Sequence, residues 1–149
     1  MEPIFAPGSL RQTIPPGQRD FFIYPAEFGS IAAAANSTVN ISISADSDFY
    51  LTALTLFATL AGAAQTEATQ VAPQLLYQVI DTGSGRQLFN TSVPAWAIAG
   101  DGKRPFRLIH PRLFRRSTTI QVQATNFSAA ETYSRSWLLF VGFKLYTLG

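Results

Sequence analysis

Apolar and polar residues alternate along several short stretches of the chain, and a period of two is typical of β-strands that bury one face. The clearest stretch is residues 38–44, in which every second side chain is branched and aliphatic: Val39, Ile41 and Ile43. Residues 119–125 repeat the pattern, with apolar side chains on one face and glutamines on the other. Both stretches therefore predict strands with one face toward a core.

Residues 49–64, with the sequence FYLTALTLFATLAGAA, differ because neither face of an extended chain would be consistently polar. The stretch lies in an uncharged segment between Asp48 and Glu67. Its threonines favour a strand, since β-branched side chains suit a pleated surface, whereas its leucines and alanines suit a buried helix equally well. Because the neighbouring segments predict strands, we expect a strand covered on both sides. One face would close the domain core, and the other would meet a second chain.

Further strands are predicted where short apolar runs are separated by turn-forming residues: residues 20–24, 75–80, 86–90, 93–98, 106–114 and 136–146. The sequence DTGSG at residues 81–85 predicts a hairpin, because glycine supplies the positive φ that a tight turn needs. Pro25 is expected to end the first strand, and Pro111 predicts that its own strand is an edge strand or contains a bulge. Gly142 predicts a bulge or a close approach of two backbones.

The pattern contains about eight strands joined by short polar turns, and it contains no convincing amphipathic helix. It therefore predicts an all-β fold, an antiparallel two-sheet sandwich, and eight strands in one domain fit a jelly roll best. An immunoglobulin-like sandwich is the second choice, because the cysteine pair of that fold is missing. Residues 19–149 are expected to form this single domain.

Residues 1–18 predict an extended N-terminal arm rather than a core strand. They contain four prolines, which fix φ and lack the N–H that a sheet ladder needs. Ile4, Phe5 and Leu10 are the apolar anchors of this arm. The arm is either a floppy tail or a segment that becomes ordered against a neighbouring molecule.

The composition favours a surface that is covered by a partner. Charged residues make up 13% of the sequence and hydrophobic residues 47%, whereas soluble domains carry charge on roughly a quarter of their residues. The absence of cysteine excludes disulfides and thiolate metal sites. Residues 1–10 do not resemble a secretory leader, and residues 49–64 fall short of the ~20 apolar residues that cross a bilayer. We expect no membrane partner.

Charge is distributed unevenly along the chain. Residues 1–100 contain three basic and seven acidic residues, a net charge of −4, and residues 101–149 contain eight basic and two acidic residues, a net charge of +6. Six cations form one basic stretch: Lys103, Arg104, Arg107, Arg112, Arg115 and Arg116. The stretch is either a solvated strand edge, a docking site for an acidic protein, or a site for single-stranded nucleic acid. Nucleic acid is the least favoured partner, because the whole chain carries only +2.

Candidate catalytic residues are few. His110 is the only histidine, so a catalytic triad or a metal site of the cupin type lacks its usual ligands, and we expect His110 to be structural or on the surface. Asp46, Asp48 and Asp81 lie in predicted turns, where aspartate is common for structural reasons. The sequence therefore predicts no catalytic residue, no metal and no cofactor.

The C-terminal half contains DTGSGRQLFN, then VPAWAIAGDGKRPFRLIHPRLF, STTIQVQATNFS and WLLFVGFKLY. This succession of strands and turns resembles small jelly-roll virion proteins of bacteriophages that act as cement or decoration proteins on capsids with the HK97-type fold. The resemblance implies a homodimer or homotrimer that clamps neighbouring major capsid subunits on the virion surface after synthesis in the host cytoplasm. It implies no active site. The arm anchors and the basic stretch are then the candidates for contact with the capsid.

Two other functions stay open at this point. One is a carbohydrate-binding jelly-roll module of a phage tail or fibre, for which Trp96 and Tyr133 are candidate exposed aromatic side chains. The other is an enzyme of the cupin or glycosidase type. A single histidine and the lack of cysteine make the enzyme the weakest of the three hypotheses.

Overall fold

The computed structural model describes residues 18–146 except positions 63, 65, 67 and 69. The arm anchors Ile4, Phe5 and Leu10 lie outside the described residues. The described elements have the following bounds: β1 Arg19–Phe28, β2 Asn36–Ser42, β3 Ser47–Leu60, β4 Leu75–Asp81, β5 Arg86–Gln87, β6 Val93–Pro94, α1 Ala95–Ile98, β7 Phe106–Phe114, β8 Thr119–Asn126 and β9 Tyr133–Tyr146.

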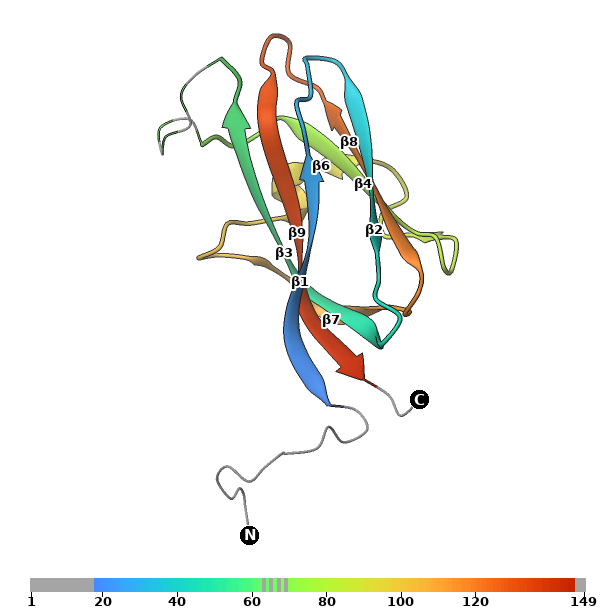
Figure 1. The fold of residues 1–149 in the computed structure, drawn as a ribbon. Coiled ribbons are helices and arrows are strands. Elements are labelled where there is room, and N and C mark those ends of the chain that lie inside the picture. The colour runs from blue at the N-terminus through green and yellow to red at the C-terminus, as the bar shows by residue number, and fades with distance from the viewer. Residues whose placement is uncertain (1–17, 63, 65, 67, 69, 147–149) are drawn as a thin grey trace.

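Two antiparallel sheets pack face to face, as the strand pattern predicts (Figure 1). One sheet has the order β1-β9-β3-β7, and the other has the order β2-β8-β4-β5 with β6 beside β4. Successive long strands alternate between the two sheets, which is the connectivity of a jelly roll. The all-β sandwich prediction is therefore confirmed. The only helix among the described elements is the four-residue turn α1, which is far too short to cross a membrane.

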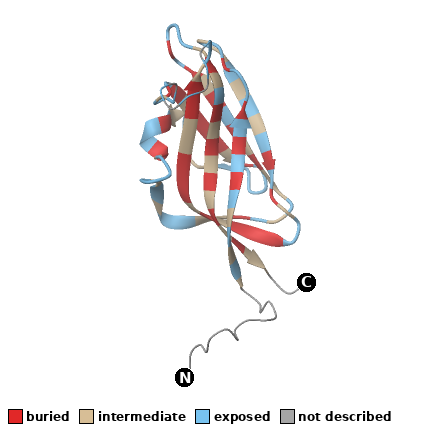
Figure 2. Ribbon diagram, turned by 60° about the vertical axis from the view of Figure 1, so that its left-hand side comes forward, coloured by how far each residue is buried: buried red, intermediate tan, exposed pale blue. Residues whose placement is uncertain are grey.

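The core lies between the sheets and is made by alternate residues of each strand, so buried and less buried bands alternate along the ribbons (Figure 2). In β8 the predicted inward residues Ile120, Val122 and Ala124 are fully buried. Ile41 and Ile43 are also buried, which confirms the alternation predicted for residues 38–44. These residues face the large inward side chains of the other sheet: Phe28, Phe49, Phe114, Leu138 and Phe140.

Residues 49–60 of the uncharged segment lie in β3, which confirms a strand there and excludes the buried helix, and the strand ends at Leu60. A bulge at Thr52 shifts the pairing register with both neighbouring strands between Leu51 and Ala53. Core-facing residues therefore have odd numbers before the bulge, as at Leu51, and even numbers after it, as at Leu54. If every second residue of the segment is assigned to the same face, residues that point inward on one side of the bulge are grouped with residues that point outward on the other side. That mixing explains why both faces of the segment looked apolar in the sequence.

Three predicted elements differ from the structure. Pro25 does not end the first strand, because β1 continues through it to Phe28. β1 is an edge strand that pairs only with β9, and an edge is where a sheet tolerates a residue without an N–H. Residues 86–90 form only the two-residue strand β5, and residues 93–98 form only the short strand β6, followed by the helical turn α1.

Strand β7 is both an edge strand and bulged, as Pro111 predicts. Its ends pair with β3 at Arg112–Phe114 and at Phe106–Arg107, whereas residues 108–111 stand opposite the single residue Thr52. Ile109 is 92% exposed within this outward bow. A bowed edge that contains proline cannot easily accept another strand.

Gly142 lies where two backbones approach closely, which confirms that alternative of the prediction. It pairs with Leu51 directly beside the β3 bulge. A Cβ atom added at Gly142 would collide with the backbone carbonyl of Tyr50, which belongs to the sheet itself and cannot rotate away. The glycine is therefore required by space and not by a positive φ.

We expect Gly142→Ala to lower the free energy of unfolding by about 1–3 kcal/mol, because the added methyl group forces β3 and β9 apart. Urea denaturation of the purified protein measures the change. Gly29→Ala is the matched control, since nothing lies within 4 Å of a Cβ at that position. Equal stability of the two variants would contradict the account of Gly142.

Candidate functional site

The outward face of the four-stranded sheet carries an unusual number of apolar side chains. We call this surface the outer face and define it by alternate residues of β1 and β9 together with two residues of β3: Arg19, Phe21, Ile23, Pro25, Glu27, Trp137, Leu139, Val141, Phe143, Leu145, Tyr50 and Phe57. Their neighbours along each strand, such as Tyr24 and Phe140, face the core.

The strand register arranges the outer face in rows. Phe21 stands beside Phe143, Ile23 beside Val141, and Pro25 beside Leu139. Charged residues lie at the two ends of the band. Arg19 stands beside Leu145, and Glu27 stands beside Trp137 and forms an ion pair with Arg135 of β9. The outer face is thus an apolar band with one charged row at each end.

Several outer-face side chains are exposed despite being large and apolar. Phe21 is 73% exposed and Ile23 is 37% exposed. Tyr50 stacks on Phe143 and Phe57 packs against Trp137, each with 5.2 Å between ring centroids. The packed rings form a preorganised surface, because their rotamers are already restricted before any partner arrives.

A shallow hollow of about 600 Å³ lies in the outer face. It is lined by Ile23, Pro25, Phe57, Trp137 and Leu139. Every lining residue is apolar, so the hollow offers a receptor for another apolar side chain rather than for a hydrogen-bonding ligand.

The charged ends of the outer face are organised differently from each other. Arg135 forms an ion pair with Glu27 and lies over the Trp137 ring, with 4.6 Å between its guanidinium carbon and the ring centroid. At the other end, Arg19 lies 5.2 Å from the centroid of the Phe143 ring. Among the described residues no carboxylate pairs with Arg19.

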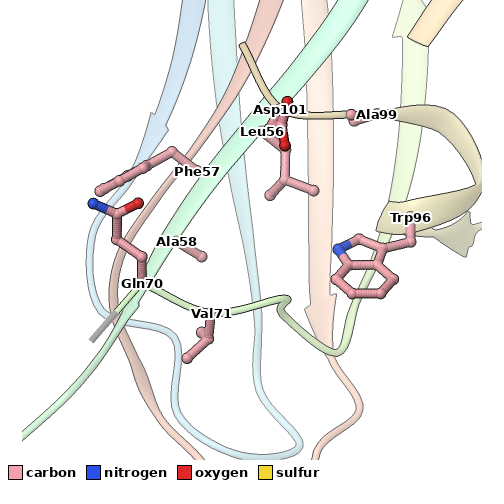
Figure 3. A pocket seen from close by; sticks show the side chains of 9 residues that line it. Leu56, Phe57, Ala58, Gln70, Val71, Trp96, Ala99 and Asp101 are labelled. Atoms are coloured by element: carbon pink, nitrogen blue, oxygen red, sulfur yellow. The ribbon is translucent and has the colours of Figure 1, made fainter. Parts of the chain in front are cut away.

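A second hollow of about 350 Å³ lies beside the edge of β3 (Figure 3). Figure 3 shows Trp96 of α1 across the hollow from Phe57 and Gln70. Trp96 is 68% exposed. Phe57 lines this hollow as well as the one on the outer face, so the two hollows adjoin at that side chain.

Asp101 lines the second hollow but its carboxylate is already used. One oxygen accepts hydrogen bonds from the backbone N–H groups of Lys103 at 2.9 Å and Arg104 at 2.7 Å. These two donors lower the pKa of Asp101 below its usual value, Arg104 contributing more. A turn-capping carboxylate whose basicity is lowered and whose oxygen is already hydrogen-bonded is not suited to general base catalysis.

A third hollow of about 380 Å³ opens beneath the bow of β7. His110 and Arg112 line it together with apolar residues that include Leu54, Ile98 and Phe106. His110 is exposed, and no cluster of three metal-ligating side chains occurs among the described residues. The described geometry thus offers His110 no second histidine or carboxylate with which to hold a metal.

The six cations of the basic stretch do not form one patch. Arg112 points toward Asp81, with 3.8 Å between Nη2 and Oδ2. Arg116 contacts Asp48 through its backbone N–H at 2.9 Å and through Nε at 3.4 Å. The other four side chains of the stretch are exposed: Lys103, Arg104, Arg107 and Arg115. The exposed cations occur on β7 and in the loops at its two ends.

The two aromatic residues that were candidates for carbohydrate binding differ in exposure. Trp96 is exposed, as the carbohydrate hypothesis requires. Tyr133 is buried to 3% exposure, and its hydroxyl oxygen accepts a hydrogen bond from the backbone N–H of Gln74 at 2.7 Å, so its predicted exposure is wrong. The sequence analysis did not identify Phe21 and Trp137 as surface residues. The signal was present in β1, where every second residue is exposed and the residues between them are less exposed: Arg19, Phe21, Ile23, Pro25 and Glu27 are the exposed ones.

Comparison of the chain with protein-family models, with curated proteins and with solved structures found no match in any of the three.

The phenol of Tyr77 is a buried ionisable group that lines none of the three hollows. Tyr77 of β4 and Ser136 of β9 come from opposite sheets, and their hydroxyl groups are buried without a well-formed hydrogen bond. Burial raises the pKa of the Tyr77 phenol above its ordinary value, and the Ser136 hydroxyl offsets part of that shift. The pair is a polar point within the core and has no access to a substrate.

We expect this phenol to make the protein less stable in alkali. Because the pKa is raised in the folded state, the unfolded chain loses a proton above about pH 10 that the folded chain keeps. The free energy of unfolding should be unaffected by this group below pH 10 and should fall by up to about 1.4 kcal/mol per pH unit above it. Urea titrations between pH 8 and pH 11 measure the slope.

Tyr77→Phe should remove this contribution while it preserves the packing of the ring. Tyr50→Phe, which changes a ring on the outer face, is the matched control and should keep the alkaline slope. If Tyr77→Phe and the unmodified protein lost stability equally above pH 10, the raised pKa would be refuted.

Proposed function

We propose that this chain is a structural virion protein, a cement or decoration protein that associates with itself and bridges neighbouring major capsid subunits of a phage head. The observation that carries the proposal is the apolar outer face. Monomeric soluble proteins rarely leave so contiguous an apolar surface uncovered, and such patches mark contacts with other macromolecules. Alternate residues of the paired strands β1 and β9 place this surface on a rigid sheet.

The physical logic of a shell protein fits this surface. A modest contact that is repeated many times in a closed lattice gives a large collective stabilisation, so no single contact has to be strong. A preorganised sheet face loses little conformational freedom when it binds. The low charge of the chain, at 13% of residues, suits a protein whose surface is largely covered.

The exposed cations support a second contact in this proposal. Arg107 lies on the edge strand β7, and Lys103, Arg104 and Arg115 lie in the loops at its two ends, whereas β1 forms the opposite edge of the same sheet. Positive charge there would steer the protein toward an acidic surface of the coat. The same charge distribution would let one molecule use its outer face for one neighbour and its β7 edge for another.

Carbohydrate binding is the second candidate, and the observation that favours it is Trp96. This ring is 68% exposed beside a hollow that also contains Gln70, and sugars are commonly held between an aromatic face and polar side chains. A glycan array tests it directly. A bound glycan whose signal is abolished by Trp96→Ala would replace the structural proposal with a tail or fibre module.

The proposal predicts that the protein co-sediments with assembled shells at a fixed ratio to the major capsid protein. Removing residues 1–17 should lower the occupancy on shells, because the arm carries the anchors Ile4, Phe5 and Leu10. The domain should remain folded, since strand pairing begins at Arg19 and the Gln18 carbonyl that binds the Tyr146 N–H is retained. Sedimentation of shells followed by quantitative gel analysis gives both numbers.

The control is the circular dichroism spectrum and urea midpoint of the shortened chain, which should match those of the full chain. Unchanged occupancy after removal of residues 1–17 would refute the role of the arm. Failure of the full chain to co-sediment with any coat lattice would refute the proposed function.

A further inference from the structure

We propose that the outer face pairs with the outer face of a second copy of this chain, about a twofold axis that runs across the strands within the interface. This arrangement places β1 over β1 and β9 over β9 of the second copy, each pair antiparallel. The inference rests on the self-association in the proposed function and identifies the surface and geometry that carry it. Two independent features of the outer face, its charges and its shape, are self-complementary in this one arrangement.

The charges of β1 are the first feature. Its outward residues follow the order Arg19, Phe21, Ile23, Pro25, Glu27, with a cation at one end, an anion at the other and apolar residues between. An axis at the level of Ile23 brings Arg19 of one copy opposite Glu27 of the second copy, and the reverse contact forms at the other end. Glu27 already pairs with Arg135 of its own chain, so Arg19 of the second copy would join an existing ion pair. An isologous interface requires such a pattern, because one patch must complement itself.

The shape of the surface is the second feature. Phe21, which is 73% exposed, and the neighbouring Phe143 form a bulky aromatic row on one side of the axis. On the other side at equal distance along the strands lie Pro25 and Leu139, which line the hollow of about 600 Å³. The twofold axis therefore places the aromatic row of each copy over the hollow of the other.

The row at the axis itself is small and flat. Ile23 and Val141 stand side by side there, and each would meet its own counterpart in the second copy. Aliphatic side chains at this level allow two sheets to approach to about 10 Å, the usual spacing of packed sheets. Strand directions within about 30° of antiparallel are the normal outcome of packing two twisted sheets.

The edges of this sheet favour pairing through the face and not by addition of strands. One edge strand, β1, contains Pro25, and the other, β7, contains Pro111 within its outward bow. Proline and a bulge both prevent an edge from accepting a further strand. A second copy is thus directed to the outer face.

Charge reversal tests the geometry. Arg19→Glu should weaken self-association by about tenfold, because two carboxylates then face each other at both ends of the interface. Glu27→Arg should weaken it similarly, because Arg19 of each copy then faces the introduced guanidinium together with Arg135, which has lost its carboxylate partner. A mixture of the two variants should form a heterodimer, since every carboxylate then meets a cation. Analytical ultracentrifugation of each variant and of an equimolar mixture measures the dissociation constants.

Phe21→Ala tests the shape. The exposed ring should act as a central anchor of the interface, and its loss should raise the dissociation constant about 30-fold or more. Phe127→Ala is the matched control, because Phe127 is 49% exposed but lies beyond β8 in the other sheet. That control should dimerise as the unmodified protein does, and circular dichroism should show that both variants are folded.

The outcomes separate this inference from the proposed function. Rescue in the mixture together with loss through Phe21→Ala supports the twofold pairing. A monomer at high concentration, or a dimer that is indifferent to both charge variants and to Phe21→Ala, overturns it. If such a protein still co-sedimented with shells at a fixed ratio, the proposed function would stand and the pairing alone would be wrong. A dimer that met every prediction here but bound no coat lattice would leave the pairing correct and the shell function wrong.

Discussion

A two-sheet sandwich buries only one face of each sheet, and this constraint determines how the molecule presents itself. The outward face of the five-stranded sheet is largely polar and is therefore suited to contact with water. Asn40 on β2 and Gln121 and Gln123 on β8 are examples. The outward face of the four-stranded sheet is not suited to water, because aromatic and aliphatic side chains occupy it between the charged rows of Arg19 and Glu27. The hydrophobic effect therefore favours a state in which that face is covered by another polypeptide.

The arrangement of the sheet makes this face a firm surface. β9 pairs along its length with β1 on one side and with β3 on the other, so its outward residues are held by two ladders. Gly142 allows β3 to bulge against β9 without a collision, and the bulge turns Phe57 outward while Leu54 turns inward. Packing of Phe57 against Trp137, with the two rings tilted, and stacking of Tyr50 on Phe143 then restrict these rings. Rigid elements of this kind carry binding surfaces more accurately than loops do.

The local pattern of the sequence was sufficient for the fold class and for most strands, because alternation reports directly which residues enter the core. It was sufficient at β8, where Ile120 and Val122 are fully buried, and at β7, where Pro111 indicated an edge or a bulge. It failed where pairing partners decide the outcome. The sequence does not show that Pro25 lies in an edge strand, or that the bulge at Thr52 reverses which residues of β3 point inward. It also does not show that the hydroxyl of Tyr133 accepts a hydrogen bond from the Gln74 N–H. The outer face was foreseen only as a second covered side of residues 49–64, whereas most of it comes from β1 and β9. The sequence could not locate this face, because the face of a sheet is assembled by pairing strands that are far apart in the chain.

The central claim is that a polypeptide covers the outer face in the working state of the protein. Hydroxyl-radical footprinting read out by mass spectrometry tests it most directly, because oxidation of a side chain reports its contact with water. The account predicts that Phe21 and Trp137 become protected as the protein passes from dilute solution to its assembled state, while the exposed Trp96 and Phe127 remain as reactive as before. Equal oxidation of Phe21 and Trp137 in the dilute and assembled states would contradict the account.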